Sequence, residues 1–224
     1  ENILYAEYQY GGMRKSDDGG HNWTSIKPPQ VGYDGGWVTP YKIHPNNPLL
    51  IVAGYDEVYR SFLGGDVDPV NSWDSISYNV SGGQSVKTIA LAPSNQNYIY
   101  AATYSTLKVT TDGGSTWNSI KSGLPNYNIT DVTISASNPD HLWVTFSGYN
   151  SSHKIYESID RGVTWTNITG NNFPGLPVNC IVHQDFSNGD LYVGTDVGVY
   201  YKDNSMNDWI PFMDGLPNVI ISEL

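Results

Sequence analysis

Short apolar runs alternate along the chain with polar turns that are rich in Asn, Pro and Gly. Residues 130–134 form one such run, a turn follows at 137–140, and a second apolar run begins at Leu142. The same order recurs, with second runs at residues 50–53, 98–101 and 191–194. Runs of this length between turn residues are typical of β-strands, whereas helices need longer stretches. The pattern therefore predicts a chain of many short strands.

The composition agrees with strands that are joined by tight turns. Charged residues make up 15% of the 224-residue chain, against about 25% in an average soluble domain. Their place is taken by 17 Tyr, 7 Trp, 23 Gly and 13 Pro. Aromatic residues favour strands, while Gly and Pro favour turns. We therefore expect an all-β fold.

One motif repeats along the whole chain. Residues 16–23, 110–117 and 158–165 share the frame Ser/Thr-x-Asp-x-Gly-x-Thr-Trp, with Asn22 in place of Thr in the first copy. Weaker copies at 61–73 and 203–209 also end in Trp, so five tryptophans recur at intervals of 44 to 50 residues. Four short strands in each interval is the pattern of a propeller blade.

This frame resembles the Asp-box, or bacterial neuraminidase repeat, of β-propeller proteins. The resemblance covers nearly the whole chain and implies a β-propeller of four-stranded antiparallel blades with Asp-box turns. About five blades are expected, and residues 1–224 are expected to form one propeller domain or a fragment of one. Secreted multi-blade proteins of this kind include glycosidase-like and sortilin-type propellers.

The two ends of the chain leave two architectures open. Residues 2–6 match a second strand of a blade, while residues 215–222 match the segment that leads into a first strand. Either the five units close into a small ring, with the C-terminal strand completing the first blade, or the chain is an arc of a larger propeller. Related propellers usually have more blades, which favours the arc.

The repeated residues are expected to be structural. The Asp carboxylate and the Ser/Thr hydroxyl can accept hydrogen bonds from the N–H groups of a tight turn. Glycine adopts a positive φ at little cost, and the Trp can bury its ring between neighbouring sheets. These residues are Ser16, Asp18, Gly20, Trp23, Thr110, Asp112, Gly114, Trp117, Ser158, Asp160, Gly162 and Trp165.

The strand order of a blade predicts which face binds ligands. With strands A to D counted outwards from the channel, the D–A and B–C connections lie on one face, and the Asp-box turns lie on the other. Exposed aromatic residues beside Asp and Asn suit sugar rings, which have an apolar face and a rim of hydroxyls. The alternative is that these rings fill the spaces between blades. The candidates are Tyr33, Trp37, Tyr55, Tyr104 and Tyr149.

Charge and residue spacing argue against several classes of function. The formal net charge of −11 disfavours nucleic acid, because affinity for phosphates comes mostly from Lys and Arg. No apolar run reaches the roughly 20 residues of a membrane-spanning helix, and the N-terminal residues do not have the pattern of a signal peptide. The five His residues show no metal-ligand spacing, so we expect neither a metal nor a cofactor.

Two enzyme classes share this kind of repeat. Sialidases need an arginine cluster, but Arg14, Arg60 and Arg161 fall near or inside Asp-boxes, so a sialidase is excluded. The chain also resembles xyloglucan-active endoglucanases, which place two carboxylates in a cleft between two propellers. Glycoside hydrolysis uses carboxyls about 5–10 Å apart. If the chain is part of such an enzyme, its candidate acids are Asp34, Asp56 and Asp131, and a second propeller is missing.

These observations favour a non-catalytic binding or interaction module of a secreted or cell-surface bacterial protein that contacts polysaccharide. The first alternative is part of a xyloglucanase-like glycoside hydrolase. The second is a structural or protein-binding propeller. The expected partners are polysaccharide, another protein, or the remaining blades or domains of a larger parent chain, with neither nucleic acid nor membrane insertion.

Overall fold

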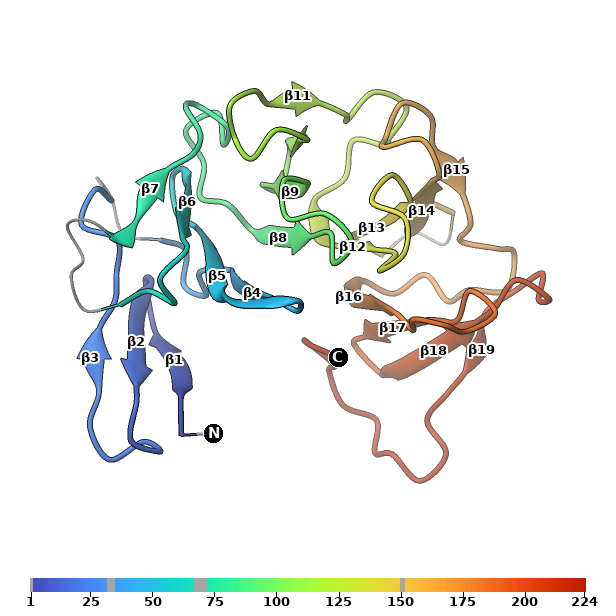
Figure 1. The fold of residues 1–224 in the computed structure, drawn as a ribbon. Helices are drawn as coiled ribbons and strands as arrows, with labels where there is room; N and C mark the ends of the chain where they lie inside the picture. Colours follow the sequence, from blue (N-terminus) through green and yellow to red (C-terminus); the bar gives the residue numbers. More distant parts are fainter. Residues whose placement is uncertain (1, 32–34, 67–71, 150–151) are drawn as a thin grey trace.

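The chain folds into five antiparallel sheets that follow one another around an arc (Figure 1). The computed structural model describes residues 2–31, 35–66, 72–149 and 152–224. Its elements are β-strands, and each sheet is one blade of a β-propeller. The all-β propeller fold predicted from the sequence is therefore confirmed. Among these residues, no helix has the length and apolar character needed to cross a membrane.

The blades are numbered in chain order, and the strands of each blade are hydrogen-bonded in sequence order. Blade 1 contains β1 (Leu4–Tyr8), β2 (Gly12–Ser16) and β3 (Thr24–Ser25). Blade 2 contains β4 (Tyr41–His44), β5 (Asn47–Gly54), β6 (Val58–Ser61) and β7 (Asp74–Ser75). Blade 3 contains β8 (Thr88–Leu91), β9 (Ile99–Ala102), β10 (Leu107–Thr110) and β11 (Asn118–Ser119). Blade 4 contains β12 (Ile129–Ile134), β13 (Leu142–Phe146), β14 (Ile155–Ser158) and β15 (Thr166–Asn167). Blade 5 contains β16 (Val178–His183), β17 (Leu191–Thr195), β18 (Gly198–Lys202) and β19 (Ile210–Pro211).

The arc is open between blade 1 and blade 5 (Figure 1). The innermost strands of blades 2 to 5 are β4, β8, β12 and β16, whereas blade 1 has three described strands and β1 is its inner edge. The C-terminal segment stays with blade 5, where the N–H of Ile221 donates to the carbonyl of Thr195 at 2.9 Å. The arc is thus confirmed, and the small ring closed by the C-terminal strand is not what the structure shows.

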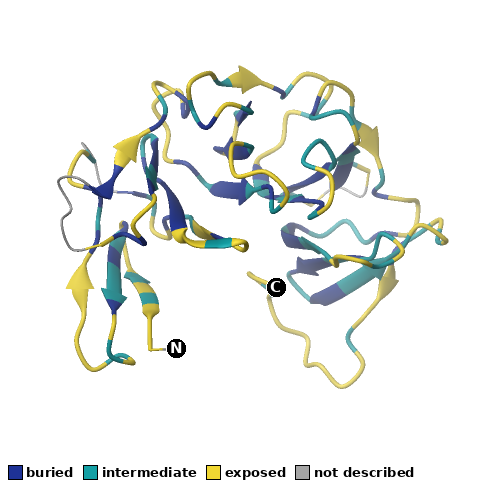
Figure 2. Cartoon of the chain, in the orientation of Figure 1, coloured by how far each residue is buried: buried dark blue, intermediate teal, exposed yellow. Residues whose placement is uncertain are grey.

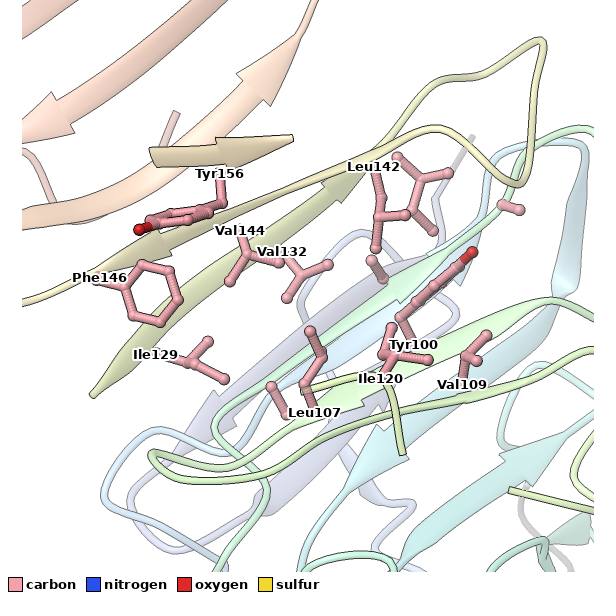
Figure 3. Packing of buried hydrophobic residues seen from close by; sticks show 14 residues of the cluster. Tyr100, Leu107, Val109, Ile120, Ile129, Val132, Leu142, Val144, Phe146 and Tyr156 are labelled. Carbon is pink, nitrogen blue, oxygen red and sulfur yellow. The ribbon is translucent and has the colours of Figure 1, made fainter. Parts of the chain in front are cut away.

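Apolar side chains fill the spaces between successive blades. In the junction between blades 3 and 4, Tyr100 and Leu107 pack in one cluster with Leu142, Val144 and Phe146 (Figure 3). Fully burying one such side chain contributes about 1.5–3 kcal/mol. Figure 2 shows that the middle strands of blades 2 to 5 are the most buried, while the outermost strands and the C-terminal segment are exposed. The blade-to-blade contacts are therefore the core of the protein.

The repeated turns are closed by their own side chains. In the turn at 110–117, the hydroxyl of Thr110 accepts from the N–H of Gly114 at 2.8 Å and donates to Asp112. The two carboxylate oxygens of Asp112 accept from the N–H and the hydroxyl of Thr116 at 2.9 and 2.7 Å. Asp160 accepts the same pair of bonds from Thr164. Because such bonds favour the ionised carboxylate, they lower the pKa of Asp112 to about 2.

In blades 3 to 5, the tryptophan that ends the repeated turn ties its blade to the preceding one. The indole N–H of Trp117 donates to the carbonyl of Ile76 at 2.8 Å. Trp165 and Trp209 make the same bond to Ile120 and Ile168 at 2.9 Å. These bonds satisfy outer-strand carbonyls that would otherwise be covered without a partner.

Candidate functional site

A cavity of about 1090 Å³ lies at the centre of the arc. Its wall is formed by the innermost strands of blades 2 to 5, by residues 7–9 and 37–42, and by the end of the C-terminal segment. It is larger than most small-molecule sites, which measure about 300–1,000 Å³, so it can admit an extended ligand. Its charged residues have both signs and are Glu7, Lys42, Lys87, Asp131 and Glu223.

Three exposed aromatic residues, Tyr8, Tyr10 and Trp37, gather where blade 1 meets blade 2, and we call them the aromatic shelf. Tyr8 and Trp37 line the cavity. The ring centroids of Tyr10 and Trp37 are 5.5 Å apart in an edge-to-face arrangement, and 64% of Trp37 is exposed. Large apolar surfaces left in solvent beside a cavity are typical of binding sites.

The shelf is held by the backbone. The N–H of Tyr10 donates to the carbonyl of Trp37 at 3.5 Å, and the carbonyl of Tyr10 accepts from Gly35 at 3.2 Å. Tyr10 has a φ of 65°, which is uncommon for a bulky residue and is found where the surroundings impose it, often at functional sites. The two loops that carry the rings are therefore fixed to each other.

Tyr55 lies beneath the shelf instead of on the surface. It is fully buried, and its hydroxyl donates to the carbonyl of Gly11 at 2.7 Å. Gly11 has a φ of 77°, and a Cβ there would collide with the Tyr55 ring. The expectation that Tyr55 contacts a ligand is therefore wrong, because its side chain packs with Met13 and Ile26 of blade 1 in the junction between the two blades.

Glu7 provides a carboxylate at the edge of the shelf. Its Oε1 accepts from the N–H of Thr39 at 2.8 Å, and the hydroxyl of Thr39 donates to the carbonyl of Gly36. Burial raises the pKa of Glu7, and the hydrogen bonds from Thr39 and Gly11 oppose that rise. This side chain was not among the candidates taken from the sequence, although it directly precedes Tyr8 in β1.

Asp131 joins three blades across the cavity wall. Its Oδ1 accepts from the hydroxyl of Thr88 at 2.8 Å and from the N–H of Val132 at 2.9 Å. Its Oδ2 accepts from the N–H of Ile181 at 3.1 Å. Burial raises its pKa, and these three bonds counteract the effect. The carboxylate is thus already engaged in holding β8, β12 and β16 together.

The remaining candidate aromatics lie farther around the arc. Tyr104 is half-exposed and Tyr149 is 78% exposed. The hydroxyl of Tyr149 donates to Asp196 Oδ2 at 3.1 Å, and Asn179 donates to the other oxygen of that carboxylate. Because Asn179 also lines the cavity, this chain of polar contacts connects Tyr149 on blade 4 to the cavity through blade 5.

Three candidates from the sequence remain, and the structure describes one of them, Asp56. Asp56 is half-buried, and its Oδ1 accepts from the N–H of Glu57 and the hydroxyl of Tyr59. Tyr33 and Asp34 lie outside the described residues. The part of the chain that is described contains no group of three or more His, Cys, Asp or Glu arranged to hold a metal ion.

A second hollow of about 460 Å³ lies between blades 3 and 4. It is lined by residues 123–127 together with His153 and Tyr156. Nδ1 of His153 lies 2.6 Å from the hydroxyl of Tyr156, and the two rings are stacked. Sequence reasoning missed His153, because a lone His carries no spacing signal.

Comparison with known proteins gives weak sequence similarity to xyloglucanases. No family model matches the chain. A probable oligoxyloglucan-reducing end-specific xyloglucanase of Neosartorya fischeri is 25% identical over 205 residues, which cover 78% of this chain and 23% of that protein. Xyloglucanase Xgh74A of Acetivibrio thermocellus is 24% identical over 253 residues, covering 93% of this chain and 29% of that protein. The chain spans less than a third of the length of these relatives.

Solved structures with the same fold include enzymes and a peptide-binding protein. The GH74 xyloglucanase from Xanthomonas campestris matches with a TM-score of 0.70 at 16% identity, covering 94% of this chain and 36% of that one. An ancestral GH74 enzyme matches with a TM-score of 0.67 at 21% identity, covering 97% and 30%. YCF48 bound to D1 peptide matches with a TM-score of 0.65 at 14% identity, covering 95% and 64%. At these identities the likeness shows the β-propeller fold alone.

Proposed function

We propose that this chain is the polysaccharide-contacting propeller part of a glycoside hydrolase-like protein, and that the aromatic shelf is its contact site. The observation that carries the proposal is the pair Tyr10 and Trp37, fixed by backbone bonds beside a cavity large enough for an extended chain of sugars. A sugar ring stacks its apolar face on such rings. Its hydroxyls then meet polar groups at the edge, such as the carboxylate of Glu7.

The charge of the chain favours a neutral ligand. With a net charge of −11, the protein repels anionic polymers, and the repulsion grows as salt is lowered. Uncharged polysaccharides are free of this penalty. The weak similarity to proteins named as xyloglucanases supports xyloglucan as the first polymer to test.

A catalytic role is the second candidate, and the same similarity supports it. Asp131 is committed to three hydrogen bonds inside the cavity wall, which favours a supporting role over proton transfer to a substrate. Asp56, the other described candidate acid, is half-buried and accepts two hydrogen bonds. We therefore propose binding without hydrolysis by this chain, and the second propeller of a complete enzyme would have to supply the facing carboxylate.

Three further properties belong to the same proposal. The repeated turns are those of the Asp-box repeat, as their hydrogen bonds support. Residues 1–224 act as one propeller unit. The parent protein is secreted or displayed at a cell surface, where a polysaccharide ligand is found.

The test is affinity electrophoresis in gels that contain xyloglucan, with an assay for newly formed reducing ends in the same samples. Retardation by xyloglucan but not by the anionic polymer polygalacturonate, without reducing ends, is the expected result. New reducing ends that disappear in Asp56→Asn would favour the enzyme instead. Equal migration with and without polymer would contradict polysaccharide contact and favour a protein-binding or structural propeller.

A further inference from the structure

The second hollow, lined by residues 123–127, His153 and Tyr156, lies on the same face of the arc as the aromatic shelf. Residues 123–127 connect β11 to β12, and His153 lies between β13 and β14. The shelf residues Tyr10 and Trp37 come from connections of the same two kinds, between β1 and β2 and between β3 and β4. Because neighbouring strands of each blade are antiparallel, these connections all emerge at one face. The two sites are therefore on one side of the arc, separated by the junction between blades 2 and 3 (Figure 1).

In the junction between blades 4 and 5, a side chain of the protein fills the place that is hollow between blades 3 and 4. Tyr200 of β18 corresponds to Tyr156 of β14, because each pairs with the second residue of the outermost strand of its blade. Phe173, from the connection that leads into blade 5, packs on Tyr200 with 5.2 Å between the ring centroids. Phe173 is 3% exposed, so its ring is enclosed in this junction.

Hydrogen bonds close the equivalent place between blades 2 and 3. Lys108 of β10 corresponds to Tyr156, and its Nζ donates to the carbonyl of Asn79 at 3.0 Å. Three residues earlier, the hydroxyl of Ser105 donates to Oε1 of Gln84 at 2.9 Å. Asn79 and Gln84 both belong to the connection from β7 to β8. Between blades 3 and 4, by contrast, Tyr156 borders a hollow of about 460 Å³.

Three aromatic rings line this hollow in similar orientations. The ring centroid of His153 is 6.2 Å from those of Tyr127 and Tyr156, with angles of 32° and 16° between the ring planes. Tyr156 is fixed in the core against Phe146, and its hydroxyl lies 2.6 Å from Nδ1 of His153. Tyr127 is 40% exposed and presents its ring to solvent. Because groups that are already held in place lose little freedom on binding, these rings are suited to stack on a ligand.

The chemistry of the lining favours a neutral ligand that has both apolar and hydroxyl surfaces. The described residues that line the hollow include no Lys, Arg, Asp or Glu, whereas the cavity at the centre of the arc has charged residues of both signs. Polar groups come from the amide of Asn126, the imidazole of His153 and two tyrosine hydroxyls. A sugar ring matches this combination, and the volume lies within the usual range of small-ligand sites, about 300–1,000 Å³.

We propose that the second hollow is an auxiliary subsite for the neutral polysaccharide, and that one polymer chain occupies it together with the aromatic shelf. This inference rests on the proposed function, because it takes the shelf as the primary contact. Once the polymer is held at the shelf, its binding at the hollow becomes intramolecular, and the effective concentration raises the overall affinity. An oligosaccharide too short to reach both sites gains nothing from the second. The affinity of the chain for its ligand therefore depends on ligand length.

The test separates the two sites by variants and by ligand length. Tyr127→Ala removes the exposed ring of the hollow, and His153→Ala removes the ring beside it. Neither residue is part of the buried core, so both variants are expected to fold, which circular dichroism checks. Trp37→Ala alters the shelf. Tyr78→Ala, at a 95% exposed position that lines neither the hollow nor the cavity, is the matched control.

Each variant is measured with xyloglucan by affinity electrophoresis and with short xyloglucan oligosaccharides by calorimetry. Tyr127→Ala and His153→Ala are expected to weaken polymer binding at least about tenfold, because the second contact is lost, and to keep the oligosaccharide affinity of the unaltered chain. Trp37→Ala is expected to weaken the binding of both ligands, and Tyr78→Ala of neither.

The outcomes distinguish this inference from the proposed function. Unchanged polymer binding in Tyr127→Ala and His153→Ala, with a loss in Trp37→Ala, would overturn the auxiliary subsite and leave the shelf as the contact site. Equal losses of polymer and oligosaccharide binding in Tyr127→Ala would also overturn the inference, because the hollow would then be the primary site. Unchanged binding in all the variants would contradict both proposals.

Discussion

The buried hydroxyl of Tyr55 donates a hydrogen bond of 2.7 Å to the carbonyl oxygen of Gly11. Gly11 directly follows Tyr10 of the aromatic shelf, and Tyr55 belongs to the neighbouring blade. The bond therefore connects the core between blades 1 and 2 to the turn that displays the exposed rings. A side chain expected to bind ligand instead supports the residues that are placed to do so.

Tyr55→Phe removes this bond, and the carbonyl of Gly11 keeps only its bond from the N–H of Met13. We expect the free energy of unfolding to fall by about 0.5–1.5 kcal/mol and affinity for xyloglucan to fall with it, because the turn of Tyr10 loses its support. Urea unfolding and affinity electrophoresis measure the two effects. Tyr100→Phe is the matched control, since it removes a similar bond to Pro139 far from the shelf. It should lose stability and keep binding, and equal binding losses in both variants would contradict the prediction.

The position of a blade in the arc decides how much its tryptophan contributes to the free energy of unfolding. Trp209 is buried against blade 4 and donates to Ile168, so Trp209→Ala is expected to lower the free energy of unfolding by about 3–5 kcal/mol. Trp23 is partly exposed and bonded within its own turn. Trp23→Ala should therefore cost clearly less in urea unfolding of dilute protein. Similar losses in the two variants would contradict the prediction.

The repeated turns predict a specific loss of stability in acid. Hydrogen bonds from the turn lower the pKa of Asp18, Asp112 and Asp160 to about 2, below the usual value of 3.8. Between these values the unfolded chain binds protons that the folded chain does not, so stability falls as the pH drops from about 4 to about 2. Thermal unfolding across this range measures the slope. Asp112→Asn should make it shallower, and an unchanged slope would contradict the assignment.

Substitution of Asp131 tests whether its carboxylate holds together the blades that form the cavity wall. In Asp131→Asn, the amide N–H₂ replaces the oxygen that accepts from Ile181, so two donors face each other inside the wall. We expect a loss of about 1–3 kcal/mol in the free energy of unfolding. Thr88→Val removes one of the other donors and should cost less, because both backbone bonds to the carboxylate remain. Urea unfolding compares the two. A fully stable Asp131→Asn would show that the carboxylate does not join the blades.

Local patterns were sufficient to predict the fold, because each blade repeats one order of strands and turns. The Asp and Ser/Thr positions of the motif mark the turns, and the tryptophans mark the junctions. The site was harder to predict. Tyr55 and Trp37 are both aromatic residues of loops on the same face, yet only the packing of blade 1 on blade 2 buries one and exposes the other. Glu7 and His153 gain their neighbours from contacts between blades, which no local pattern records.

Polysaccharide contact through the aromatic shelf is tested most directly by titrating the chain and its Trp37→Ala variant with xyloglucan oligosaccharides in a calorimeter. Trp37 is exposed and outside the core, so the variant should fold normally. Loss of one stacking ring is expected to weaken binding at least about tenfold, which corresponds to about 1.4 kcal/mol. Tyr78→Ala, on an exposed loop that does not line the cavity, should bind as the unaltered chain does. Equal affinity of the Trp37→Ala variant and the unaltered chain would contradict the account.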